Sequence, residues 1–333
     1  MIAGRGGGIR MRTAFVFGGS GFIGTRLIGK LVRMSEYRQV ISLDLRRPAN
    51  PVAGAEYNYC DVREPIQVEG DFGEVEIFNL TAIHVTPGHD DYEYFWTNVL
   101  GALNVCEFAS QKNCRLVVFT SSIAVYGPSE ERLTEASKLT PDSAYGMSKV
   151  QAERIHRLWQ GSNPDNRLMI IRSAAVYGPG ERGNFTRLAR LLKRGSFIYS
   201  GRRDTVKACC YVDELVRAIF FVRSLGKPDV TFNFTYPEPY TIQDICRVMA
   251  DVGGYAKPKL TLPMPLMLSA AQVFEIAGKA GLKTPINRDR VMKLVRSTNI
   301  ACKALIEMGY EFETDLKQSF VRWRDESPAG EFV

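Results

Sequence analysis

The chain has 333 residues, 45% of them hydrophobic, which is enough for one large domain or two modest ones with a substantial core. It contains no low-complexity tract and no internal repeat, which excludes a disordered chain and a solenoid. Its net charge of +7 comes from scattered basic residues, without a basic run interleaved with aromatics. This pattern favours binding of anionic small molecules over binding of nucleic acid.

The first ten residues are rich in Gly and Arg, and we interpret them as a flexible leader before Met11. They lack the apolar centre of a secretory signal, so export is not expected. The seven cysteines are odd in number and have no paired two-residue spacing, which favours a reduced, cytoplasmic protein without a zinc or thiol redox site. The three histidines, at 84, 89 and 156, are wrongly spaced for a metal site.

A glycine-rich turn follows the first strand-like run, at 13–17, and opens a helical pattern. Gly18, Gly21 and Gly24 allow the backbone to turn tightly, to approach a pyrophosphate and to pack the helix on the sheet. Asp44 lies twenty positions beyond the last glycine, and this spacing predicts a dinucleotide site.

The carboxylate of Asp44 is placed to accept hydrogen bonds from both hydroxyls of an adenosine ribose, which favours NAD over NADP. Arg46 and Arg47 stand beside it and can compensate the charge of a 2'-phosphate, so NADP stays an alternative. A simple cap at the end of a strand is the other interpretation of Asp44.

Five apolar runs alternate with helical patterns, at 13–17, 40–44, 75–80, 115–120 and 168–172. The alternation predicts an α/β fold with a Rossmann-type, doubly wound parallel sheet. Ligands of such sheets bind beyond the carboxyl ends of the strands. We therefore expect a cofactor to lie along residues 80–84. Asp61 and Val62 are placed to meet an adenine ring, although an ordinary turn explains that pair almost as well.

A tyrosine and a lysine four residues apart, Tyr145 and Lys149, share one face of a predicted helix. A phenol has a pKa of about 10, and an ammonium group together with a cationic nicotinamide ring favours its ionised form. Tyr145 is therefore a candidate general acid or base. Ser122, just after the run 115–120, is placed to bond the same substrate oxygen.

Together these motifs resemble the extended short-chain dehydrogenases/reductases, in particular the branch of nucleotide-sugar epimerases and dehydratases. The resemblance covers nearly the whole chain. Its markers are the segment 18–24, Asp44, Asp61 with Val62, 80–82, Asn98 with Gly101 and Asn104, 120–127, Tyr145 with Lys149, 176–180 and 211–213.

The resemblance implies that Ser122 bonds the reacting oxygen, that Tyr145 moves the proton, and that Lys149 holds the ribose and lowers the pKa of the phenol. It implies NAD as the cofactor. The residues expected to contact NAD are Gly18, Gly21, Phe22, Ile23, Gly24, Asp44, Leu45, Arg46, Asp61, Val62, Leu80, Thr81, Ala82, Asn98, Thr120, Tyr145 and Lys149.

The same resemblance divides the chain into a NAD-binding Rossmann domain at 11–175, with a returning segment near 209–236, and a smaller, mixed α/β substrate domain at 176–208 and 237–333. It implies a homodimer through a helix pair that includes 98–109 and 149–159. The apolar stretch 260–277 is interrupted by two prolines and by polar residues, so we interpret it as a helix of the substrate domain. Peripheral membrane contact is the lesser alternative.

On the substrate side, Asn184 resembles the segment that contacts the nucleotide diphosphate, and Tyr199 resembles an aromatic residue beside the base. Simple edge-strand packing explains Tyr199 about equally well. Lys207 stands where relatives often carry an arginine, and a lysine offers a point charge without the bidentate fork. Arg290 is the candidate for the second phosphate contact, although a solvated basic helix face is as good an explanation.

The chain departs from the family pattern at other positions. Ala175 replaces an asparagine found in many relatives, which removes one expected amide contact to the substrate. Ile123 and Ala124 stand where dehydratases carry an Asp-Glu pair, and neither exchanges a proton. The 4,6-dehydration that depends on this pair is therefore not expected.

These observations favour a NAD-dependent epimerase of a nucleotide-diphosphate sugar, acting at C4 through a transient 4-keto intermediate, for polysaccharide or glycoconjugate synthesis. The alternative is a 4-keto-sugar reductase that consumes NAD(P)H. A non-catalytic NAD-binding protein is a third hypothesis, against which the intact set of Ser122, Tyr145 and Lys149 argues.

Overall fold

The structure is a computed structural model that describes residues 11–85, 88–269 and 295–333. The chain forms two compact units, each described by itself. Unit 1 contains residues 1–125, 139–173 and 216–232. Unit 2 contains residues 126–138, 174–215 and 233–333.

Unit 1 is built on a seven-stranded sheet in the order β11-β7-β5-β4-β1-β2-β3. The registered pairs from β7 across to β3 are all parallel. The order reverses between β1 and β4, as in a doubly wound fold, which confirms the predicted fold class. The strands are β1 (Arg12–Phe17), β2 (Tyr37–Asp44), β3 (Glu56–Tyr59), β4 (Glu74–Asn79), β5 (Leu116–Ser122), β7 (Arg167–Ser173) and β11 (Asp229–Phe234).

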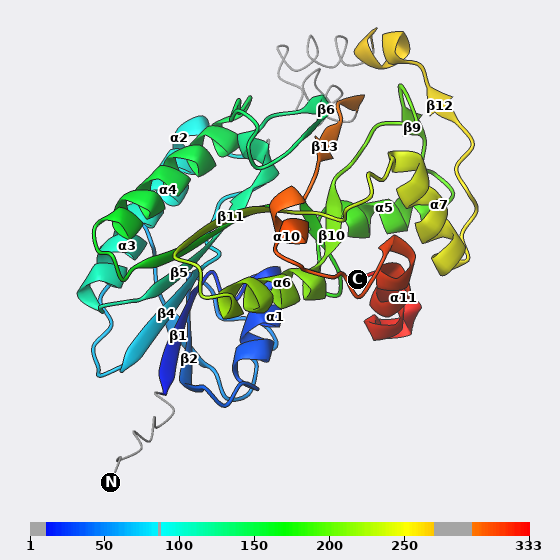
Figure 1. The fold of residues 1–333 in the computed structure, drawn as a ribbon. Coiled ribbons are helices and arrows are strands. Elements are labelled where there is room, and N and C mark those ends of the chain that lie inside the picture. The colour runs from blue at the N-terminus through cyan, green and yellow to red at the C-terminus, as the bar shows by residue number, and fades with distance from the viewer. Residues whose placement is uncertain (1–10, 86–87, 270–294) are drawn as a thin grey trace. The chain divides into compact units, whose positions relative to one another are not determined.

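Helices cover both faces of this sheet, with α3 and α4 on one face and α1 on the other (Figure 1). Hydrophobic strand residues on both faces require such cover, because a central parallel sheet exposes neither side to water. The helical elements are α1 (Phe22–Leu31), α2 (Asp91–Phe95), the π-helical turn η1 (Trp96–Leu100), α3 (Gly101–Gln111), the 3-10 turn η2 (Ile123–Val125), α4 (Ala144–Gly161) and α6 (Val212–Ser224).

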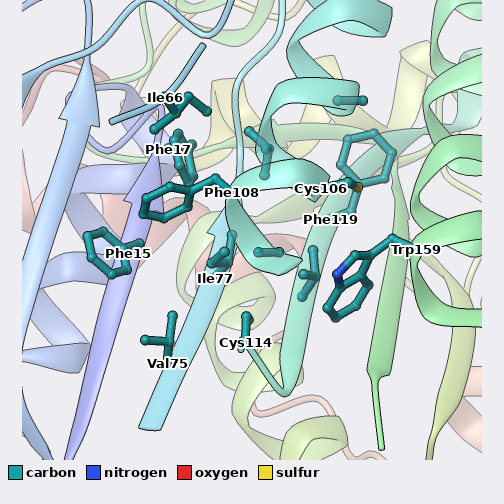
Figure 2. Packing of buried hydrophobic residues seen from close by; sticks show 14 of the residues in the cluster. Phe15, Phe17, Ile66, Val75, Ile77, Cys106, Phe108, Cys114, Phe119 and Trp159 are labelled. Atoms are coloured by element: carbon teal, nitrogen blue, oxygen red, sulfur yellow. The ribbon is translucent and has the colours of Figure 1, made fainter. Parts of the chain in front are cut away.

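The core of unit 1 lies between the sheet and α3 (Figure 2). The ring of Phe108 on α3 meets Phe15 and Phe17 of β1 edge to face, with ring centroids 5.1 and 5.8 Å apart. All three side chains are fully buried. Edge-to-face contacts add to the free energy gained from burying large apolar area, so Phe108 anchors α3 to the sheet.

Unit 2 holds three parallel two-stranded sheets and a helical layer. Its strands are β6 (Ser129–Leu133), β8 (Ala175–Tyr177), β9 (Tyr199–Ser200), β10 (Cys209–Tyr211), β12 (Thr261–Leu262) and β13 (Thr298–Ile300). Its helices are α5 (Asn184–Lys193), α7 (Ile242–Gly253), α10 (Lys303–Glu307), α11 (Leu316–Glu326) and the 3-10 turn η3 (Pro328–Gly330).

An aromatic cluster forms the centre of unit 2. Tyr177 of β8 stacks on Phe185 of α5, with centroids 4.5 Å apart, and lies 5.0 Å from Phe320 of α11. In the stretch 260–277, where a helix is predicted, the structure has a helix at 264–269, and residues 270–277 lie outside the described residues. Within the described part of the chain, no helix is long and apolar enough to cross a membrane.

We expect Phe108→Ala to lower the free energy of unfolding by about 3–5 kcal/mol, because it removes a buried ring and leaves a cavity between α3 and β1. Urea denaturation followed by circular dichroism measures this change. Glu107→Ala, an exposed neighbour on the same helix, is the control and is expected to change stability by less than about 0.5 kcal/mol. Equal effects of the two variants would contradict the assigned core.

Candidate functional site

The glycine turn between β1 and α1 brings backbone segments into direct contact. A Cβ atom added to Gly24 would lie 2.5 Å from the carbonyl oxygen of Gly18, so a side chain there forces the turn and the helix apart. Gly18 has a φ of +74°, which a side chain rarely tolerates. Gly21 caps α1 without any side-chain hydrogen bond, which leaves the amides of the first helical turn open to an anion.

Asp44 ends β2 beside this turn. One carboxylate oxygen accepts a hydrogen bond from the Ser20 amide at 3.1 Å, and the other accepts one from the Arg46 amide at 3.1 Å. The carboxylate is therefore held across the top of the glycine turn, where a ribose is expected. Leu45 and Arg46 are exposed next to it.

Asp61 and Val62 follow β3, and Asp61 already has a partner within the protein. Its carboxylate forms a two-pronged ion pair with the Arg63 guanidinium, with N–O distances of 2.9 and 2.6 Å. These hydrogen bonds lower the pKa of Asp61. Val62 is buried and packs against the backbone of Gly101 on α3. The predicted adenine contact must therefore share Asp61 with Arg63.

The segment after β4 is fixed by side-chain amides. Asn98 accepts from the Ile83 amide at 2.9 Å and donates to the Ser148 hydroxyl at 2.9 Å, so it ties this segment to α4. The Thr81 hydroxyl is buried and has no partner within the described residues. An unsatisfied buried hydroxyl beside the glycine turn is the kind of group that a bound dinucleotide satisfies. The close backbone packing that Gly24 permits and the buried Thr81 hydroxyl both fit bound NAD.

All three predicted catalytic residues lie in unit 1, and the structure brings Ser122 to Tyr145, one helical turn before Lys149. Ser122 ends β5, and its hydroxyl hydrogen-bonds the phenol of Tyr145 on α4. The approach depends on Gly146, because a Cβ atom there would lie 2.4 Å from the carbonyl oxygen of Ala124. The Ser143 hydroxyl accepts from the Gly146 amide and fixes the start of the helix.

Lys149 is 1% exposed, and its ammonium nitrogen lies 4.2 Å from the ring centroid of Phe119 on β5. Burial lowers the pKa of Lys149 to about 7, and the carboxylate of Glu153 acts in the opposite direction. Burial also raises the pKa of Tyr145, against the opposing effect of the bond from Ser122. Within the protein itself, Tyr145 is therefore held as a neutral phenol. The buried ammonium of Lys149 loses its proton easily, so it does little by itself to ionise the phenol.

Sequence reasoning missed His156, a buried polar residue on the same helix as Lys149. The His156 ring stacks on Phe119 with centroids 4.0 Å apart. Its Nδ1 lies 2.7 Å from the Ala152 carbonyl oxygen, and its Nε2 lies 3.2 Å from the Asn79 amide. Burial lowers the pKa of His156 to about 4, so the ring is neutral and connects β4 to α4. Its spacing of seven residues from Lys149 was the available signal.

Apart from Ser122, the predicted substrate residues that the structure describes belong to unit 2. Asn184 begins α5, and its amide oxygen accepts from Arg187 at 2.8 Å. Tyr199 is buried, with the Arg203 guanidinium 5.1 Å above its ring. Lys207 donates to the Arg296 carbonyl oxygen at 2.8 Å, and burial lowers its pKa to about 8. Arg290 lies outside the described residues.

Among residues 11–85, 88–269 and 295–333, no group of three or more His, Cys, Asp or Glu side chains is arranged to hold a metal ion. All seven cysteines are free.

Comparison with known proteins gives three kinds of similarity. A protein-family model described as the NAD dependent epimerase/dehydratase family matches residues 14–233. The chain is 25% identical over 311 residues to the N-acetyl-alpha-D-glucosaminyl-diphospho-ditrans,octacis-undecaprenol 4-epimerase of Escherichia coli O157:H7, covering 92% of each chain. It is 29% identical over 279 residues to the UDP-glucose 4-epimerase of Vibrio cholerae, covering 77% of this chain and 79% of that one.

Among solved structures, the UDP-glucuronic acid 4-epimerase of Bacillus cereus in complex with NAD aligns with a TM-score of 0.70 at 18% identity. The alignment covers 93% of this chain and 96% of that chain. At this identity the similarity shows a shared fold.

We expect Asp44→Asn to weaken NAD binding about 10- to 100-fold, because hydrogen bonds to a charged acceptor contribute about 1.5–3 kcal/mol. Isothermal titration calorimetry with NAD measures the dissociation constant. Asp71→Asn, an exposed acidic residue at the far end of the loop before β4, is the matched control and should bind NAD like the parent protein. Unchanged affinity of Asp44→Asn would remove Asp44 from the cofactor site.

Proposed function

Because the chain belongs to the NAD dependent epimerase/dehydratase family and is an enzyme with NAD as its cofactor, we propose that it interconverts the C4 epimers of a sugar diphosphate. The observation that carries the proposal is the hydrogen bond between Ser122 and Tyr145, one helical turn before Lys149, in the unit that also contains the glycine turn. Both curated relatives described above are named as 4-epimerases, which supports position C4.

Ser122, Tyr145 and Lys149 have separate roles in the proposed reaction. Bound NAD supplies the group that accepts a hydride from the sugar and later returns it. Ser122 holds the reacting oxygen. Tyr145, once its phenol is ionised, takes the hydroxyl proton as the carbonyl forms and returns that proton to the same oxygen when the hydride comes back to the opposite face of the rotated sugar. Lys149, when protonated, favours the ionised phenol.

The first candidate substrate is a nucleotide-diphosphate sugar, with Asn184, Tyr199, Lys207 and Arg290 as its proposed contacts. Lys207 carries much of this proposal, because a partly buried amine offers an anionic phosphate a charge that is less screened than one at the open surface. Cytoplasmic location follows from this substrate class and from the free cysteines.

A second candidate carrier is a polyprenyl diphosphate, with the same sugar chemistry. The supporting observation is a run of exposed apolar residues in unit 2, where Leu260 is 66% exposed and Leu266 is 59% exposed. Lys257 and Lys259 precede them and are exposed. Exposed leucines next to lysines suit an anionic lipid surface. The E. coli relative is named for an undecaprenol-linked sugar.

We expect the purified protein, incubated without added NAD(H), to convert one sugar of a panel into its C4 epimer. The panel contains UDP-, GDP- and dTDP-sugars and a polyprenyl-diphosphate N-acetylhexosamine in detergent, and NMR reads the products. Turnover of the lipid-linked sugar alone would establish the second carrier. No turnover across the panel would move the assignment to a keto-sugar reductase, tested next with NAD(P)H.

Tyr145→Phe is the control variant for this assay. It removes the transferable proton and keeps the ring, so the rate should fall about 100- to 10,000-fold while NAD still binds. Retained activity would exclude Tyr145 as the acid and base. Retained cellular function of an inactive variant would support the non-catalytic hypothesis.

We also propose that the protein is a homodimer through α3 and α4. Leu158 on α4 is 76% exposed, and Leu103 on α3 is exposed as well. The two helices pack against each other, so these side chains lie on neighbouring elements of one unit. A second copy of the same face would bury them.

Leu158→Glu is therefore expected to convert the dimer into monomers, because it places a charge in an apolar contact. Size-exclusion chromatography with light scattering gives the mass. Leu191→Glu, at an exposed leucine of α5, is the control and should leave the mass unchanged. A parent protein with the mass of one chain would contradict the dimer.

A further inference from the structure

We propose that Glu153 is a positioning residue of this site, whose buried carboxylate fixes the end of β5 that carries Ser122 and supplies the counter-charge for Lys149. The proposal extends the proposed function and rests on it for the role of Lys149. No motif of the sequence singled out Glu153.

Glu153 lies on α4 one turn after Lys149, and it is almost completely buried, as are Arg172 and Ser121. One oxygen of its carboxylate accepts from the Ser121 hydroxyl at 2.6 Å and from Arg172 Nε at 3.0 Å. The other oxygen accepts from Arg172 Nη2 at 2.8 Å. A two-pronged guanidinium pair fixes both the position and the plane of the carboxylate.

The partners of Glu153 stand next to the reacting groups. Ser121 precedes Ser122, and the two serines pair across the sheet with Arg172 and Ser173 of β7. Ser121 bonds to Glu153 and Ser122 bonds to Tyr145, so consecutive residues of β5 hold two points of α4. A displacement of Glu153 therefore moves the strand end and the helix relative to each other.

The charge of Glu153 acts on Lys149. Burial favours the neutral amine, and the nearby carboxylate favours the ammonium. The other titratable or charged side chains packed around Lys149 in the described part of unit 1 do not replace it. Arg172 of β7 is a cation bound to Glu153, burial keeps His156 of α4 neutral, and burial raises the pKa of Tyr145, so none of these three supplies a negative charge to Lys149.

The charge of Glu153 sets the direction in which the pKa of Lys149 changes. Loss of the carboxylate charge lowers the pKa of Lys149 further, so less of the ammonium form is present near pH 7. Since the protonated form is the one that holds the phenol ready for proton transfer, the active fraction then falls at a lower pH than in the parent protein.

The experiment is an NMR titration of the full-length protein labelled with 13C at the lysine ε carbon, with the Lys149 signal assigned by its loss in Lys149→Met. Glu153→Gln keeps the shape and the acceptor for Ser121 and removes the charge. We expect the midpoint of the Lys149 titration to fall by about 1 pH unit or more. An unchanged midpoint would overturn the proposal.

Two further variants separate this role from a merely structural one. Ser121→Ala keeps the charge and removes one hydrogen bond, so the Lys149 midpoint should stay while kcat falls and KM is kept. Glu153→Gln/Arg172→Gln also removes the buried cation that Glu153→Gln leaves without its carboxylate. The double variant should therefore fold at least as well and show the same lowered midpoint, and it provides the measurement if the single variant does not fold.

The titration needs no substrate, so its outcome is independent of the sugar panel. A lowered Lys149 midpoint in a protein that epimerises nothing would support the role of Glu153 and contradict the proposed function. An unchanged Lys149 midpoint in a Glu153→Gln variant that still epimerises a sugar would contradict the role of Glu153 and support the proposed function.

Discussion

The direct contact between the start of α4 and the end of β5 is the constraint on which the site depends. Gly146 permits it, because any side chain at that position would collide with the Ala124 carbonyl oxygen. The contact brings the phenol of Tyr145 to Ser122. The remaining polar contacts in this region of unit 1 stabilise the same approach, through Asn98 and Ser148 on one side and Glu153 and Ser121 on the other.

Close packing of α4 has an electrostatic consequence. Lys149, Glu153 and Arg172 are all removed from water, and one carboxylate serves two cations. Buried ion pairs repay their desolvation only with good geometry, which the two-pronged Arg172 pair provides. The carboxylate of Glu153 forms its ion pair with Arg172 and only partly offsets the effect of burial on Lys149. The charge of Lys149 therefore changes near neutral pH. A lysine whose charge changes near neutral pH suits a site in which a proton is transferred.

The family assignment and the parallel sheet were predictable because their signals are local. Glycines at 18, 21 and 24, an acidic residue at the end of the next strand, and a tyrosine and lysine one helical turn apart are all short-range patterns. The match of residues 14–233 to the family model and the strand order confirm both predictions. The NAD and substrate contacts stay predictions, residue by residue, and Asn98 and Asp61 already have partners within the protein.

The sequence by itself determined the fold class and the cofactor, and it predicted Ser122, Tyr145 and Lys149 as the reacting side chains, because periodicity and spacing survive in a linear chain. Tertiary structure alone decided the lowered pKa of Lys149, the neutrality of His156 and the contacts of Glu153 from which its role is proposed. These depend on burial and on partners far apart in sequence, such as Ser121 and Arg172 around Glu153. A pKa is the sum of such three-dimensional contacts, and no short segment of the chain contains that sum.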